Sequence, residues 1–350
     1  MKLVEDAIRE EILSGRYSPG KRLPGVREFA ERFRCSRGTV SNALKGLSEQ
    51  GLIRTEHGRG TFLSESPGRV VRSVSRMIGA ALLRYSWMEK MELLREEYLK
   101  NGWFISSYCS SDDMQNPAAE RRFLELALEQ NFAGVILTGT PLEPLNTELY
   151  HSLRKSGMKI IHLTHYKKDM TGEPAILPDY RMSGAMACSI AAASGRKRFA
   201  VVGVNEICPP STVLRKEGIA LMKRSLSLEE LPALKLSCGD RITSDSEPRI
   251  REFFRECGPL EDLALIADDC ATLYDLQKWM EQNQVPGREK LLTLSMSDTH
   301  WSKKEVNYIG FDYAESLRMA MDYILDDEIS PLEPYQRVIS PFYHPISIKN

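Results

Sequence analysis

The sequence contains no long hydrophobic run. None of its apolar stretches approaches the roughly 20 residues that a membrane-spanning helix needs. The first residues, MKLVEDAIREEILSG, alternate apolar and charged side chains and include several acidic ones, which is unlike a secretory signal peptide. We therefore expect a cytoplasmic protein that makes no contact with membranes.

Metal-binding and disulfide patterns are also missing. The seven cysteines form no C-x-x-C pair, and the six histidines are not paired. An odd, unpatterned cysteine count favours reduced thiols over a disulfide framework, and it excludes a recognisable zinc site. We expect no metal and no cofactor. The cysteines are Cys35, Cys109, Cys188, Cys208, Cys238, Cys257 and Cys270.

The chain has almost no net charge, −1 over 350 residues, which by itself argues against a nucleic-acid partner. The charge is unevenly distributed, however. Residues 1–70 hold 13 Lys and Arg against 9 Asp and Glu, a balance of +4 that leaves −5 for the remainder. A basic N-terminal region on an acidic body is suited to local contact with phosphates.

The N-terminal region predicts three helices. Residues 2–15 have apolar side chains on one face and end at Gly15. A second helix follows Pro24, and Ser36 is placed to cap a third. The third helix carries Arg37, Ser41, Asn42 and Lys45 opposite its apolar face. A short helix with such a polar face fits the major groove of DNA. Its expected buried side chains, with those of the second helix, are Val26, Phe29, Ala30, Phe33, Val40, Ala43, Leu44 and Leu47.

Two short strands, 52–54 and 61–63, flank a glycine-rich tip. Glycine allows close approach of the backbone to phosphates or a minor groove, and basic residues supply charge there. The tip holds His57, Gly58, Arg59 and Gly60. The whole N-terminal region is therefore predicted to be a winged helix-turn-helix.

The stretch GRYSPGKRLPGVREFAERFRCSRGTVSNALKGLSEQGLIRTEHGRGTFL resembles the DNA-binding domain of GntR-type bacterial transcription regulators. The shared landmarks are PG-x-x-LP-x-x-R-x-x-A, SR-x-TV, L-x-x-x-GLI and GRGTF. The residue after TV is often a DNA-contacting arginine in relatives but is Ser41 here, so the base preference is open. Each basic residue is alternatively an ordinary solvated side chain. The resemblance places Arg27, Arg37, Thr39, His57, Gly58 and Arg59 on DNA, and the exposed helix face adds Ser41, Asn42 and Lys45.

From residue 77 onward, buried strands alternate with amphipathic helices, beginning with strands at 77–83, 103–109, 133–139 and 158–164. This alternation predicts right-handed crossovers and a parallel, doubly wound sheet. The pattern restarts near residue 174 and continues to the helix at 314–327, which predicts a second lobe of the same kind. We expect a DNA-binding domain at 1–66, a linker at 67–76 and a two-lobed domain at 77–345. The linker is alternatively an ordered strand or a hinge.

The fold class is thus α/β, with a winged helix-turn-helix followed by two Rossmann-like, parallel-sheet lobes; the resemblance described next implies that these lobes are similar to a periplasmic binding protein. Ligands of such sheets bind at the carboxyl ends of the strands. Two lobes that face each other in this way form a clamp that closes on a ligand.

The two-lobed region is similar to the effector domain of LacI-type regulators. The segments that carry this more diffuse resemblance are RRFLELALEQNFAGVILTG, SGMKIIHL, SGAMACSIAAASGRKRFAVVG, STVLRKEGIALM, and DLALIADDCATLYDLQKWMEQNQVPGREKLLTLSMSDT. The resemblance implies a sugar-like ligand, gripped by the Arg215 guanidinium. GntR heads on LacI-like bodies form a recognised group of sugar-responsive regulators.

Other candidate ligand contacts follow strand ends. Asp268 and Asp269 lie where relatives place an Asn/Asp pair; we favour Asp268 as the contact and Asp269 as a helix cap. Ser297 replaces an aspartate that often binds ligand in relatives, which leaves the ligand's identity open. Aromatic side chains give a sugar a face to rest on, although a tryptophan in such a place is alternatively core or hinge packing. The remaining candidates at strand exits are Arg84, Tyr85, Trp87 and Trp301.

We therefore expect a repressor of carbohydrate metabolism genes whose partners are a double-stranded DNA operator, a small carbohydrate-like effector and a second copy of the chain in a homodimer. The alternative is a Rossmann-like enzyme with a regulatory DNA-binding head, but G-x-G-x-x-G and P-loop motifs are both missing. Another alternative keeps the head and attaches an antiparallel or an all-helical, metal-binding body. The strand–helix alternation speaks against it.

Overall fold

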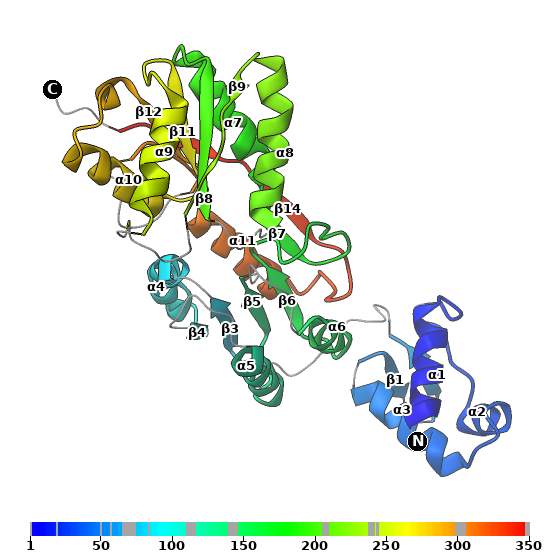
Figure 1. Ribbon diagram of the computed structural model, residues 1–350. Helices are drawn as coiled ribbons and strands as arrows, with labels where there is room; N and C mark the ends of the chain where they lie inside the picture. The colour runs from blue at the N-terminus through cyan, green and yellow to red at the C-terminus, as the bar shows by residue number, and fades with distance from the viewer. Residues whose placement is uncertain are drawn as a thin grey trace.

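The structure is a computed structural model and describes residues 2–18, 20–49, 51–56, 58–64, 75–82, 85–109, 117–138, 146–204, 210–236, 242, 245–297 and 306–346. Figure 1 shows an N-terminal head and two α/β lobes. Each of the three has its own cluster of buried side chains. Among the described residues, no helix is both long enough and apolar enough to cross a bilayer.

The head is a winged helix-turn-helix, as predicted. Its core is built around the fully buried Phe29, Val40 and Leu47. The Ser36 hydroxyl accepts a hydrogen bond from the Thr39 backbone N–H at 3.1 Å, which confirms the predicted cap. The elements of the head are α1 (Lys2–Leu13), α2 (Val26–Arg32), α3 (Arg37–Glu49) and the antiparallel strands β1 (Ile53–Glu56) and β2 (Gly60–Leu63).

The first lobe contains a sheet of six strands in the order β14-β7-β6-β5-β3-β4, and every neighbouring pair is parallel. The inner strands β5, β6 and β7 are buried on both faces, which explains their continuous apolar sequences, whereas the edge strand β14 is largely exposed. Their bounds are β3 (Met77–Leu82), β4 (Phe104–Cys109), β5 (Gly134–Leu137), β6 (Lys159–His162), β7 (Ala175–Pro178) and β14 (Gln336–Ile339).

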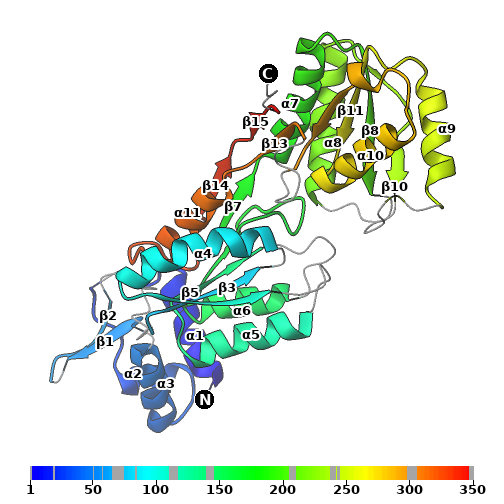
Figure 2. The same cartoon turned by 90° about the vertical axis from the view of Figure 1, so that its left-hand side faces the viewer.

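Two helices cover each face of this sheet (Figure 2). On one face Met91 and Leu94 of α4 pack with Leu317 and Met321 of α11. On the other face the buried side chains come from α5 and α6. The helices are α4 (Tyr85–Lys100), α5 (Pro117–Glu129), α6 (Thr147–Lys155) and α11 (Tyr313–Leu325).

A buried lysine closes the end of α11. The Lys159 side chain is only 7% exposed, and its ammonium donates hydrogen bonds to the backbone carbonyls of Tyr323 at 2.9 Å, Ile324 at 3.2 Å, and Asp326. The last carbonyls of a helix have no intrahelical donor, and a cation there also interacts favourably with the helix dipole. Lys159 therefore anchors a C-terminal helix to a strand that lies more than 160 residues earlier in the chain.

The second lobe has a sheet in the order β10-β8-β11-β12-β13-β15, with β9 beside β8. All of its pairs are parallel except β13 with β15. One face is covered by α9 and α10 and the other by α7 and α8. The elements are β8 (Arg198–Val204), β9 (Glu229–Glu230), β10 (Leu234–Leu236), β11 (Leu263–Ala267), β12 (Leu292–Ser295), β13 (Tyr308–Gly310), β15 (Phe342–His344), α7 (Tyr180–Ala193), α8 (Pro210–Ser225), α9 (Glu247–Cys257), α10 (Cys270–Gln282) and a 3-10 turn, η1 (Arg288–Lys290).

Helices α7 and α8 touch backbone to backbone. A Cβ added to Gly184 would lie 2.1 Å from the carbonyl oxygen of Arg215, and one added to Gly218 would lie 1.9 Å from that of Arg181. No other residue type fits at these two positions without moving a helix. The crossing therefore fixes where α8 lies on α7.

The lobes are interleaved rather than consecutive, which corrects the prediction of two tandem units. Strand β7 and helix α11 were assigned to the second lobe, but both belong to the first. The described chain crosses between lobes after β7, after β13 and after β14. Hydrophobic periodicity is local and does not specify which sheet a strand joins. The short strands β9, β13, β14 and β15 were not predicted.

Candidate nucleic-acid interface and ligand site

The polar face of α3 is open to solvent. Arg37, Ser41, Asn42 and Lys45 are all exposed, while the opposite face of the helix is buried. Thr39 is half-buried, and its hydroxyl lies 2.9 Å from that of Ser36 at the start of the helix. The structure thus brings these predicted DNA contacts together on one accessible surface.

Two other predicted contacts are held by carboxylates. Arg27 pairs with Glu31 at 3.1 Å, and Arg59 pairs with Glu56 at 2.7 Å. Both arginines are more than three-quarters exposed, so each pair contributes little to stability and can be exchanged for a phosphate at small cost. Gly58 has a φ of 74° at the tip of the wing. His57 lies outside the described residues.

The carboxyl ends of both sheets point to the junction between the lobes, because β7 leads directly into α7 and β13 into α11. Aromatic side chains from these crossings meet there. The ring of Tyr180 lies 5.5 Å from that of Phe311, and the Asp179 N–H donates to the Ile339 carbonyl at 2.9 Å. Residues of three crossings thus form one small core at the junction.

Arg215 of α8 lies beside this core. Its side chain is 7% exposed, its guanidinium stacks over the Tyr180 ring at 5.0 Å, and Nη1 donates to the Asp268 carbonyl at a long 3.4 Å. Its Nε is buried and has no hydrogen-bond partner among the described residues. A buried donor without a partner costs free energy unless a water or a ligand supplies an acceptor.

Asp268 follows β11 and faces the same place. A Cβ at Gly203 would lie 2.4 Å from its carboxylate, so glycine at the end of β8 makes room for that group. Burial raises the pKa of the Asp268 carboxyl, and the nearby Arg215 opposes this effect. Perturbed carboxyls at strand ends are common in functional sites. The structure thus brings Arg215 and Asp268 together.

Two further candidates have local roles in the structure. Asp269 caps α10, since its carboxylate accepts hydrogen bonds from the backbone N–H of Thr272 at 2.8 Å and from its hydroxyl at 2.7 Å. Ser297 is half-buried, and its carbonyl accepts from the Cys270 thiol and the Ser295 hydroxyl, each at 2.7 Å. Both follow neighbouring strands at the edge where Asp268 lies.

The aromatic candidates are placed differently from the expectation of a strand-exit loop. Trp87 lies in the first turn of α4, is 5% exposed, and packs 4.5 Å from the ring of Tyr313, next to the junction core. Trp87 therefore packs in the core, which is the alternative to a surface on which a sugar would rest. Tyr85 is the first residue of α4, and the structure does not describe its side chain; Arg84 and Trp301 lie outside the described residues.

His165 lies beside Tyr180 and was not predicted from the sequence as a ligand contact. Its ring lies 5.6 Å from that of Tyr180, and its Nδ1 is buried with no hydrogen-bond partner among the described residues. Burial lowers the pKa of His165 to about 4, so the imidazole is neutral at pH 7. The sequence signal that could have identified His165 is its position shortly after the end of β6, because Asp268 was selected for the same kind of position after β11.

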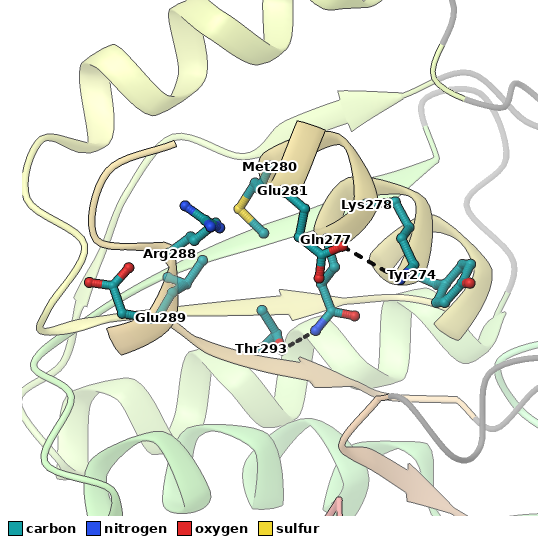
Figure 3. Close-up of a pocket in the computed structure, with 9 residues that line it drawn as sticks. Tyr274, Gln277, Lys278, Met280, Glu281, Arg288, Glu289 and Thr293 are labelled. Carbon is teal, nitrogen blue, oxygen red and sulfur yellow. Dashed lines mark hydrogen bonds and ion pairs between the residues drawn. The ribbon is translucent and has the colours of Figure 1, made fainter. Parts of the chain in front are cut away.

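Two hollows of about 440 and 700 Å³ lie elsewhere, on the second lobe at the amino ends of β11 and β12. Figure 3 shows the smaller one, between α10 and the segment that contains η1. Its polar groups are partly paired, Gln277 with Thr293 at 2.9 Å and Lys278 with Glu281 at 3.5 Å. Neither hollow includes a predicted effector residue.

The raised pKa of Asp268 makes a prediction about stability. Between its ordinary value of 3.8 and the raised value, the folded state binds more protons than the unfolded state. Stability due to this group is therefore fully present at low pH and is lost as pH rises through the folded pKa. We expect Asp268→Asn to be more stable than the parent in urea at pH 8, with the difference shrinking toward pH 4.

As a control, Asp269→Ala removes a cap and should lower stability by about 1 kcal/mol at both pH values. An Asp268→Asn difference independent of pH would contradict the assignment.

The N-terminal head is similar in sequence to known proteins. Residues 2–63 match the family of bacterial regulatory proteins called the gntR family. The chain is 34% identical over 91 residues to the histidine utilization repressor of Klebsiella aerogenes, covering 26% of this chain and 38% of the relative. It is 24% identical over 182 residues to the arabinose metabolism transcriptional repressor of Halalkalibacterium halodurans, covering 50% and 47%. The chain thus spans less than half the length of these curated relatives.

The two lobes are similar to solved structures. A LacI family transcriptional regulator from Bifidobacterium animalis superposes with a TM-score of 0.62 at 16% identity, covering 79% of this chain and 97% of that one. The Cra dual regulator of Pseudomonas putida, in complex with fructose 1-phosphate, gives 0.58 at 15% identity, covering 77% and 98%. The N-terminal domain is therefore a GntR-type helix-turn-helix, and the rest has the fold of LacI-type effector domains and periplasmic binding proteins.

Proposed function

We propose that this chain is a cytoplasmic DNA-binding transcription regulator, a repressor of carbohydrate metabolism genes controlled by a small sugar-like effector between its lobes. The observation that carries the proposal is the exposed, cationic face of α3 beside a glycine-tipped wing, in a domain that matches a family of bacterial regulatory proteins. Arg37, Thr39, Ser41, Asn42 and Lys45 contact the major groove. Arg27 and the tip residues His57, Gly58 and Arg59 contact phosphates or the minor groove.

The effector site is proposed at the strand ends around Arg215 and Asp268. A guanidinium and a carboxylate give a polyhydroxylated molecule several hydrogen-bond partners at once. Two of the similar proteins support a carbohydrate, because one is a repressor of arabinose metabolism and one solved structure holds fructose 1-phosphate. The proposed site is completed by the other candidate contacts, which are Asp269, Ser297, Arg84, Tyr85, Trp87 and Trp301.

The mechanism we propose couples the two sites through lobe closure. The effector prefers one degree of closure, and closure changes the spacing of two heads in a homodimer and so their fit to two DNA half-sites. A thermal-shift screen over monosaccharides and sugar phosphates tests the effector half. A ligand at a hundred times its dissociation constant adds roughly 2.7 kcal/mol to native stability. If none of the carbohydrates in the screen stabilises the protein, the proposed effector class is wrong.

The DNA half is tested on α3. We expect Arg37→Ala to weaken binding to the promoter DNA of the chain's own gene by about 10- to 100-fold, which corresponds to about 1–3 kcal/mol for a base contact. The measurement is a gel-shift titration at fixed salt. Lys100→Ala, on an exposed face of α4 in the first lobe, is the control and should bind as the parent does. Equal affinity of the Arg37→Ala variant and the parent would contradict the assignment.

A further inference from the structure

A further segment of backbone borders the wing hairpin through an isolated β-bridge. The segment before α2 runs antiparallel to β2, with Arg22 opposite Phe62. The Leu23 N–H donates to the Thr61 carbonyl at 2.8 Å, and the Leu63 N–H donates to the Lys21 carbonyl at 2.8 Å. These bonds fix the register of Arg22 on the hairpin.

The two faces of this small sheet differ sharply. Leu23, Ile53 and Leu63 are at most 3% exposed and face the core of the head. Side chains directly opposite one another on neighbouring strands share a face, and alternate residues point to opposite faces. Arg22 and Arg54, each opposite Phe62 on its own side, are therefore both on the outer face. The guanidinium of Arg54 lies 5.9 Å from the centre of the Phe62 ring.

Gly60 makes room for Arg22. It lies two residues before Phe62 on the same face, and a Cβ there would be 2.7 Å from Nε of Arg22. Its φ of 116° is a conformation that other residues rarely adopt. The arginine side chain therefore passes over the glycine, from the base of the wing toward its tip.

The charges around this arginine are unbalanced. The single carboxylate of the hairpin, Glu56, pairs with Arg59 at 2.7 Å and with Arg54 at 3.6 Å. Within the described part of the chain, Arg22 is exposed and has no carboxylate partner. An exposed guanidinium held against a wing without a counter-charge is suited to a phosphate.

We infer that Arg22 is a further DNA contact, which binds the phosphate backbone beside the wing, and that Gly60 is the residue that positions it. The inference rests on the proposed function, since it adds one contact to the same DNA interface. The contact is to a phosphodiester, so it strengthens binding to any sequence alike.

The test uses the full chain and a fluorescein-labelled 24-base-pair duplex of mixed sequence. Anisotropy is measured between 50 and 200 mM NaCl. Each phosphate contact contributes about 0.9 to the slope of log K against log salt. We expect Arg22→Gln to reduce the magnitude of the slope by about 1 and to weaken binding about five- to tenfold at the lowest salt. Arg22→Lys should retain the parent slope. Arg249→Gln removes an exposed charge from α9 in the second lobe and should change neither quantity.

Gly60→Ala tests the positioning. The added Cβ displaces Arg22, so this variant should lose the same unit of slope, and adding Arg22→Gln to it should cause no further loss. Additive losses would show that Gly60 does not act through Arg22. Melting of the head, followed by circular dichroism, shows whether each variant folds.

The outcomes separate two hypotheses. A parent protein with no salt-dependent DNA binding would reject the proposed function itself. A parent that binds, with an Arg22→Gln variant of unchanged slope, would overturn only the role of Arg22. A reduced slope that lysine restores supports it.

Discussion

Replacing Lys159 by methionine should lower the free energy of unfolding by about 3–5 kcal/mol, because hydrogen bonds to charged groups are strong and buried acceptors left unpaired are costly. The ammonium donates to the carbonyls of Tyr323, Ile324 and Asp326, and methionine leaves these groups without that donor. The measurement is the urea midpoint by circular dichroism.

Lys155→Met is the matched control. Lys155 lies four residues earlier in the chain, at the exposed end of α6, and a change there should stay within about 0.5 kcal/mol. If both variants unfold at the parent midpoint, the end of α11 does not depend on Lys159. Loss confined to Lys159→Met shows that the lysine anchors α11 to the first sheet.

The second large effect is expected at the crossing of α7 and α8. Gly218→Ala places a methyl group 1.9 Å from the carbonyl oxygen of Arg181, and backbone cannot rotate away as a side chain can. Overpacking costs about 1–3 kcal/mol, and contact with backbone places this variant at about 3 kcal/mol. Thermal and urea unfolding measure the change.

Gly184→Ala should be as destabilising, and it has a functional consequence. Its methyl group would lie 2.1 Å from the carbonyl of Arg215, so α8 must shift and carry that guanidinium away from Tyr180. Any carbohydrate that stabilises the parent should stabilise this variant less. Leu221→Ala, on the exposed face of α8, is the control and should change stability by no more than about 0.5 kcal/mol. If Leu221→Ala destabilises the protein as much as Gly218→Ala and Gly184→Ala do, the losses do not come from the contact between the α7 and α8 backbones.

Local features of the fold could be predicted from the sequence. Ser36 and Asp269 cap their helices because an oxygen side chain at that position meets a free N–H, whatever the rest of the fold. The buried strands β5 and β11 were visible as short apolar runs. In the head, motifs such as GRGTF allowed the fold of the whole domain to be predicted, beyond its single helices and strands.

Features that depend on distant partners could not be predicted. Nothing in AESLRMAMDYILDD tells that its apolar face covers the first sheet rather than the second. Strands as short as β13 and β15 lack a period long enough to recognise. Trp87 was expected at a strand exit, but it lies in the first turn of α4, and Tyr313, the ring it packs against, is more than 200 residues away in the sequence. For the proposed ligand site, Arg215 and Asp268 were each selected from the sequence, and the structure places them near each other, whereas His165 was not selected.

The interleaving of the lobes has a consequence for synthesis of the protein. A nascent chain that has left the ribosome as far as β13 still lacks α11, one of the two helices on the face of the first sheet, and β14, the strand that borders β7. The first lobe therefore keeps apolar strands uncovered until residues 336–339 have been translated. Premature termination anywhere before residue 336 should yield fragments that aggregate, because the apolar face of the first sheet stays uncovered.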